Sequence, residues 1–176
     1  MRPIVGWALE GLSFTGDALG QARLGEPAWG PLGLLRDLEL RLGLPREQAL
    51  ASARVPLYRA RIEMLADSRA FYARSFAVDA LGTAQAVLAW RDDLVDAGWN
   101  GAPIVGGGER LDALAALEPP ISETLPLATA DRMARAETAL RVRGTHSAIY
   151  EEVKLVEARE IWSERWQRIF TLLQQS

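Results

Sequence analysis

The expected fold depends on the apolar stretch Ile4-Val5-Gly6-Trp7-Ala8-Leu9, which is followed by Glu10 and Gly11. Its length and the glycine behind it are typical of a short buried strand rather than a helix. A second strand is expected within 149–156, where apolar and charged residues alternate, and 76–78 is a further candidate. Because helical segments separate these runs, the sequence predicts a mostly helical α/β fold with a mainly parallel sheet.

Helical signals dominate the rest of the chain. Pro31 and Gly43 bracket one predicted helix, since proline suits the first turn and glycine follows the last. Asp79 is expected to cap a long helix that ends at Gly98. A further helix is predicted at 129–141.

Length and composition limit the classes of protein that the chain can represent. Its 176 residues, 49% of them hydrophobic, suit one globular domain with a sizeable core, and exclude a disordered or collagen-like chain. The absence of cysteine excludes disulfides and thiolate catalysis, and the single His146 excludes a multi-histidine metal cluster. A net charge of −3 argues against a globally basic nucleic-acid binder. No apolar run reaches the roughly 20 residues of a membrane span, and no signal peptide is recognisable, so a cytoplasmic protein without a membrane partner is expected.

Gly11 and Gly16 have the spacing of the two glycines in a phosphate-binding P-loop, G-x-x-x-x-G-K-[ST], and they follow the predicted first strand. In that loop the lysine neutralises the phosphates and the hydroxyl holds magnesium. Here Asp17 and Ala18 stand at those positions, and the carboxylate would repel a triphosphate by about 1 to 4 kcal/mol at about 4 Å. The only lysine, Lys154, is far along the chain. We therefore expect either an ordinary loop or a degenerate phosphate loop, without a cofactor and without productive Mg-ATP binding.

Glu152-Val153-Lys154 fits the (D/E)-x-K half of a metal-dependent nuclease site, in which carboxylates hold magnesium and the lysine positions water. Strand alternation would place Glu152 and Lys154 on one face. The nearest upstream aspartate, Asp131, lies at the start of a predicted helix rather than on a neighbouring strand. A solvent-facing charge pair is therefore the favoured interpretation.

Two further groups of charged residues have both a structural and a functional interpretation. A basic stretch in the predicted helix at 129–141 and just beyond it could contact a DNA backbone, although a solvated helix face is favoured. Its members are Arg132, Arg135, Arg141 and Arg143. An acidic cluster at the end of the long helix is expected to be a solvated helix end rather than a divalent-ion site. Its members are Asp92, Asp93 and Asp96.

A final helix is predicted after Ser163. Its apolar residues recur at helical spacing, which favours core packing of both tryptophans over stacking on nucleic-acid bases. They are Trp162, Trp166, Ile169 and Leu173.

Several phrases of the sequence resemble one protein family. The most distinctive is FYARSFAVD at 71–79, followed by TA at 83–84 and LAWRDDL at 88–94. The others are GPLGLL at 30–35, LE at 38–39, LGL at 42–44, GW at 98–99 and WSERW at 162–166. Together they resemble the N-terminal part of large bacterial AddB-like proteins, which are inactivated superfamily I helicases fused to a C-terminal PD-(D/E)XK nuclease domain.

This resemblance implies a RecA-like domain over 1–176, with a helical insertion at about 31–117 and a degenerate P-loop, as part of a longer protein. It implies a non-catalytic scaffold of a DNA-repair nuclease, with DNA, the remaining domains of the polypeptide and a helicase–nuclease subunit as partners. No catalytic residue and no metal site carry over, because the family's nuclease module lies far downstream. Two alternatives stay open: a stand-alone magnesium nuclease using Glu152 and Lys154, and a protein-interaction module without a nucleic-acid role.

Overall fold

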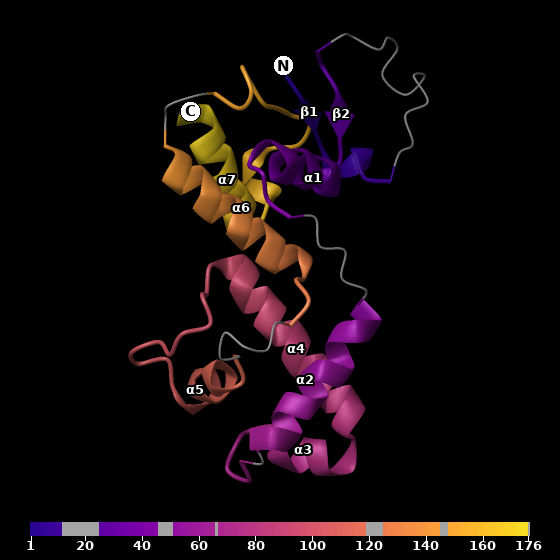
Figure 1. Cartoon of the computed structure of the whole chain (residues 1–176), viewed down its shortest axis with the longest axis vertical. Helices are drawn as coiled ribbons and strands as arrows, with labels where there is room; N and C mark the ends of the chain where they lie inside the picture. The colour runs from indigo at the N-terminus through magenta and orange to yellow at the C-terminus, as the bar shows by residue number, and fades with distance from the viewer. Residues whose placement is uncertain (12–24, 46–50, 66, 119–124, 145–147, 176) are drawn as a thin grey trace. The chain divides into compact units, whose positions relative to one another are not determined.

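The computed structural model describes the chain except for residues 12–24, 46–50, 66, 119–124, 145–147 and 176 (Figure 1). The chain divides into two compact units. Unit 1 comprises Met1–Arg46 and Arg132–Ser176, and unit 2 comprises Glu47–Asp131. The single domain expected from the sequence stays a prediction. Within the described residues, no helix has the length and apolar character needed to cross a bilayer.

Unit 1 contains a small sheet of three two-residue strands, β1 (Ile4–Val5), β2 (Ala28–Trp29) and β3 (Lys154–Leu155). Their order is β2-β1-β3, and both pairings are parallel, as expected. β1 stops after Val5 because the backbone turns at Gly6 into the short 3₁₀ helix η1 (Trp7–Leu9).

The RecA-like, mainly sheet architecture is wrong. Among the described residues, the seven helices α1–α7 far outweigh these short strands, and the fold is mainly helical. The apolar runs at 4–9 and 149–156 suggested longer strands, but only two residues of each pair in the sheet. The candidate strand at 76–78 is helical and forms the end of α3 (Ala73–Val78), where the Phe76 N–H donates to the Tyr72 carbonyl.

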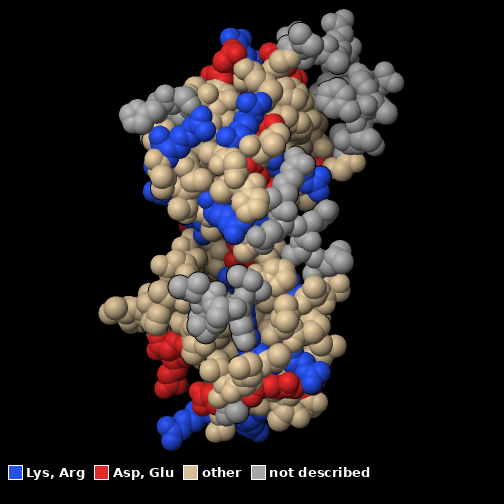
Figure 2. Space-filling model, in the orientation of Figure 1, with Lys and Arg blue, Asp and Glu red and all other residues tan. Residues whose placement is uncertain are grey.

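The helices of unit 1 are α1 (Pro31–Arg41), α6 (Thr129–Arg143) and α7 (Glu164–Gln175), together with the 3₁₀ helix η2 (Arg159–Ile161). The first turn of α6 belongs to unit 2. Pro31 begins α1, and Gly43 follows its last turn with φ +66°, as the sequence predicted. Side chains of both charge signs lie on the face of unit 1 that Figure 2 shows.

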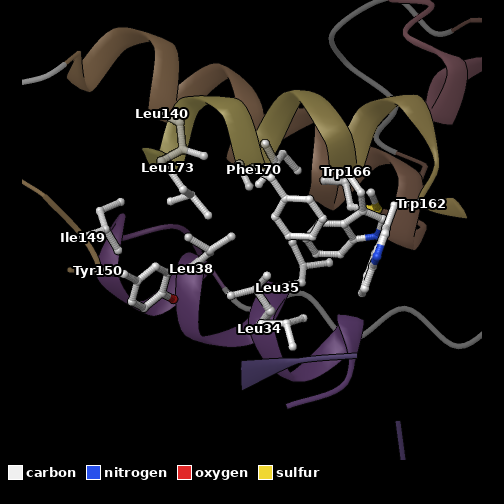
Figure 3. Close-up of a cluster of buried hydrophobic side chains, with 14 residues drawn as sticks. Leu34, Leu35, Leu38, Leu140, Ile149, Tyr150, Trp162, Trp166, Phe170 and Leu173 are labelled. Carbon is white, nitrogen blue, oxygen red and sulfur yellow. The ribbon is translucent and has the colours of Figure 1, made fainter. Parts of the chain in front are cut away.

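The core of unit 1 lies where aromatic side chains of α7 meet leucines of α1 (Figure 3). Trp162 and Trp166 are 2% and 3% exposed, which confirms that both are core residues. Trp162 packs edge-on against Phe170, with ring centroids 5.1 Å apart. The predicted apolar face is therefore the one that α7 buries.

Unit 2 consists of α2 (Ala51–Leu65), α3, α4 (Ala80–Ala97) and α5 (Glu109–Ala116). Asp79 caps α4 as predicted, because its Oδ1 accepts the Gly82 N–H at 2.9 Å. Gly98 ends the helix with φ +117°, a conformation that glycine adopts without strain. Buried side chains of α2 and α4, including Tyr58, Ile62 and Leu88, form its core.

Candidate functional site

The carboxyl ends of the three strands form the candidate site, because parallel sheets bind ligands at this edge. The register pairs Val5 with Trp29 on one side and with Leu155 on the other. β1 leads into η1 and β2 leads into α1, so the first N–H groups of both helices lie at the same edge. Such N–H groups are the usual donors to a bound phosphate.

Two glutamate side chains already occupy these donors. The Glu157 carboxylate accepts the N–H of Trp7 at Oε2, at 3.1 Å, and that of Ala8 at Oε1, at 3.2 Å. Oε2 of Glu10 accepts the N–H of Leu32 at 2.9 Å, in the first turn of α1. The anions at this edge are therefore supplied by the chain itself.

Two glycines permit the close approach of these glutamates. A Cβ atom added at Gly30 would lie 2.3 Å from Oε2 and 2.4 Å from Cα of Glu10. One added at Gly6 would lie 2.8 Å from Cβ of Val156 and 3.0 Å from Oε2 of Glu157. Glycines beside a strand end often admit a ligand, but here they admit the chain's own carboxylates.

The predicted phosphate loop lies mostly outside the described residues. Gly11 has φ +75°, in the left-handed region, and no described residue lies within 4 Å of the position of its missing Cβ. Gly16, Asp17 and Ala18 lie outside the described residues. The degenerate loop therefore stays a prediction.

Arg132, one of the predicted DNA contacts, forms a bidentate ion pair. Its Nε and Nη2 donate to the two carboxylate oxygens of Glu39, each at 2.7 Å. Glu39 is 2% exposed. These hydrogen bonds raise the pKa of Arg132 above its ordinary value, against the effect of burial. The pair connects α1 to α6 within unit 1.

Arg141 donates to a second buried carboxylate, Glu137, at 2.8 Å. Arg165 and Arg168 of α7 donate to the same carboxylate at 2.7 and 3.1 Å. Burial alone would raise the pKa of Glu137, but the three guanidinium groups together hold it below its ordinary value. Arg135 and Arg143 also interact within the chain. DNA contact by these arginines stays a prediction.

The residues of the alternative nuclease site do not gather around a metal position in the part of the chain described. Lys154 lies in β3 with Nζ 3.4 Å from Oε1 of Glu26, and Glu152 is exposed before that strand. Asp131 is ion-paired with Arg91 and Arg54 in unit 2. Among the described residues, no three carboxylate or histidine side chains form a group that could hold a metal ion.

Unit 2 contains a buried ion network that sequence reasoning missed. Arg54 pairs with Asp92, and Nε and Nη2 of Arg91 donate to the two carboxylate oxygens of Glu118 at 2.9 and 3.1 Å. Burial would lower the pKa of Arg91, but Glu118 and Asp131 raise it above its ordinary value. The expectation that Asp92 is solvated is therefore wrong. The available signal was the place of Arg91 on the apolar stripe of α4, between Leu88 and Val95.

A second missed feature surrounds Phe71, within the phrase that carries the family resemblance. Two cavities, of about 460 and 250 Å³, are each lined by Phe71.

No protein-family model, curated protein or solved structure matches the chain. The described residues define a mainly helical protein in which Glu10 and Glu157 accept backbone N–H groups at the carboxyl ends of a small parallel sheet.

Proposed function

We propose that the chain is a non-catalytic scaffold part of a bacterial DNA-repair nuclease, which docks other protein parts and does not turn over ATP. The observation that carries this proposal is the occupation of the sheet edge by Glu10 and Glu157. The resemblance of residues 71–94 to AddB-like proteins supplies the biological setting.

A phosphate and a carboxylate compete for the same backbone donors. Glu157 is tethered beside η1 and Glu10 beside the first turn of α1, so both carboxylates act at a high effective concentration. A nucleotide would have to displace these carboxylates or approach them, and like charges about 4 Å apart repel by roughly 1 to 4 kcal/mol. Asp17, which stands where a P-loop has its lysine, would add to that repulsion.

Docking is favoured over DNA contact because arginines of α6 are ion-paired with carboxylates of the same chain. Arg132 and Arg141 each donate to a carboxylate that is nearly inaccessible to solvent. Moving Arg132 to a DNA phosphate would leave the buried Glu39 carboxylate unpaired, at a cost of several kcal/mol. Moving Arg141 would take away one of the three guanidinium partners of Glu137.

Isothermal titration of the folded chain with Mg-ATP tests the non-catalytic role. We expect no saturable heat of Mg-ATP binding. Near-ultraviolet circular dichroism of the same sample verifies that the titrated protein is folded. Micromolar binding of Mg-ATP would overturn the proposal.

A nuclease assay on single- and double-stranded DNA with Mg²⁺ provides the second test. We expect no cleavage. Metal-dependent cleavage that the Lys154→Ala variant abolishes would overturn the scaffold role in favour of the stand-alone nuclease.

A further inference from the structure

The smaller of the two cavities lies within unit 2, where α3 packs beside α4 (Figure 1). Its volume of about 250 Å³ suits one small chemical group rather than a drug-sized ligand. One face of α4 and its cap line the cavity, because spacings of three and four residues fall on the same side of a helix. The residues of that face are Asp79, Gly82, Thr83, Ala86, Val87 and Trp90.

Three aromatic side chains line this cavity, those of Phe71, Tyr72 and Trp90. The ring centroid of Phe71 lies 5.1 Å from that of Tyr72 and 5.9 Å from that of Trp90. The faces of such rings carry partial negative charge and attract cations, tryptophan most strongly. Arg110, which lines the larger cavity, already has its guanidinium carbon 5.8 Å from the Phe71 ring centroid. The ring cluster therefore has the chemistry of a cation site.

Asp79 is the only charged residue among the described residues that line the smaller cavity. Its Oδ1 accepts the Gly82 N–H, whereas its Oδ2 has no hydrogen bond or ion pair with any residue that the structure describes. The N-terminus of α4 carries roughly half a positive charge, so the full charge of the carboxylate leaves this rim negative. A cation in the cavity is therefore attracted by both the carboxylate and the rings, and an anion is repelled.

The neighbouring larger cavity adds to the negative charge around these rings. It is lined by three carboxylates and two guanidinium groups, those of Asp67, Glu109, Asp112, Arg69 and Arg110. The pKa of Tyr72 is raised above its ordinary value, mainly by burial and further by the charge of Asp67. The charge of Asp67 thus acts on one of the three rings.

The cavity has both a buried wall and an open side. Tyr72 is 5% exposed and supplies the wall, whereas Trp90 is 50% exposed. Asp79 and Ala86 also lie at the surface. A small ligand can therefore enter from solvent and still pack against a buried ring.

We propose that this cavity binds an alkylammonium group, whose carbon substituents pack on Phe71, Tyr72 and Trp90 while Asp79 balances its charge. An alkylammonium group is apolar at its surface and positive at its centre, which matches a lining of rings with one carboxylate. A hard metal ion would require several oxygen ligands, and this lining supplies one carboxylate. The site is separate from the strand ends on which the scaffold role rests.

The test titrates choline into the full ¹⁵N-labelled chain. Binding is followed through the indole N–H of Trp90, assigned from the Trp90→Phe spectrum, and through the backbone N–H of Ala86. We expect choline to shift both signals and not the indole N–H of Trp7, a similarly exposed tryptophan of unit 1. The uncharged alcohol in which carbon replaces the choline nitrogen has the same shape, and should bind about tenfold more weakly.

A peptide that carries one trimethyl-lysine distinguishes a protein side chain from a free small molecule as the source of the group. Tighter binding of the peptide than of choline would assign the group to a partner protein. Equal or tighter binding of choline would assign it to a free small molecule. Either result supports the alkylammonium site.

Two variants test the roles of the ring and the carboxylate. Trp90→Leu should lower the preference for choline over its uncharged isostere by about fivefold, measured through the Ala86 signal. Asp79→Asn keeps the oxygen that caps α4 and should weaken choline binding by about threefold. Glu160→Gln removes an exposed carboxylate of unit 1 and should leave the affinity unchanged.

The proposal is overturned if neither choline nor the trimethyl-lysine peptide shifts the Trp90 and Ala86 signals. It is also overturned if the uncharged isostere binds as tightly as choline, or if Trp90→Leu keeps the full preference for choline. None of these outcomes bears on ATP binding or DNA cleavage, so they are distinguishable from failure of the scaffold role.

Discussion

Arg54 holds Asp92 through two hydrogen bonds, from Nη1 to Oδ2 at 2.5 Å and from Nη2 to Oδ1 at 2.9 Å. The Arg54 side chain is 7% exposed, and its Nε donates to the carbonyl of Pro126 at 2.8 Å. The guanidinium therefore has its main donors satisfied within unit 2, and it joins α2 to α4 and to the segment before α6.

Asp92→Ala should destabilise unit 2 by about 3 kcal/mol, because it leaves a nearly buried guanidinium without its main carboxylate. The adjacent Asp93 is exposed and supplies a matched control. Asp93→Ala should change the free energy of unfolding by less than about 0.5 kcal/mol. Urea unfolding followed by circular dichroism measures both, and equal effects of the two substitutions would contradict the ion network.

Arg132→Ala should destabilise unit 1 by about 3 kcal/mol, because the carboxylate of Glu39 would stay buried and unpaired. The double variant Glu39→Leu/Arg132→Leu removes both charges and should recover most of that loss. Tryptophan fluorescence during urea unfolding reports on the change. A double variant that is no more stable than Arg132→Ala would show that the unpaired Glu39 carboxylate is not the cause of the destabilisation.

Acid should weaken unit 1 partly through Glu137. The pKa of this carboxyl is lower in the folded protein than its ordinary value of 4.5, so its stabilising effect is complete above that pH. The effect is lost as the pH falls from about 4.5 through the folded-state value. Urea midpoints measured across this range should fall less steeply for Glu137→Gln, which cannot titrate, than for the wild type. Parallel curves would show that Glu137 does not drive the acid loss.

Asp79→Ala should destabilise α4 by about 1 kcal/mol, because the Gly82 N–H loses its acceptor. Asp79→Asn keeps a side-chain oxygen at the same place and should be close to wild type. Thermal unfolding of the two variants measures the difference. An alanine variant as stable as the asparagine variant would rule out a stabilising cap.

The helix boundaries could be predicted because their causes are local. Pro31, Asp79 and Gly98 act on the backbone within one helical turn, and each lies where the sequence placed a helix end. The core face of α7 was predictable for the same reason, since helical spacing puts Trp166, Ile169 and Leu173 together. Trp162 joins this core from just before the helix.

The sheet and the site could not be predicted because their causes are distant in sequence. The apolar run at 4–9 leaves the sheet after Val5, where Glu157 takes the N–H groups of Trp7 and Ala8 from about 150 residues away. No periodicity within the run contains that information. The apolar patterning therefore overestimated the strands, and the RecA-like fold that the family resemblance implied is wrong.

β1, the central strand, has one neighbour encoded early in the chain and the other encoded after the whole of unit 2. During synthesis, Glu47–Asp131 leaves the ribosome as one continuous segment, while the sheet of unit 1 waits for Lys154 and Leu155. Until then the Glu157 carboxylate is also missing, and the first N–H groups of η1 stay open to solvent. The order of translation thus delays closure of this edge of the sheet until the whole of unit 2 has been synthesised.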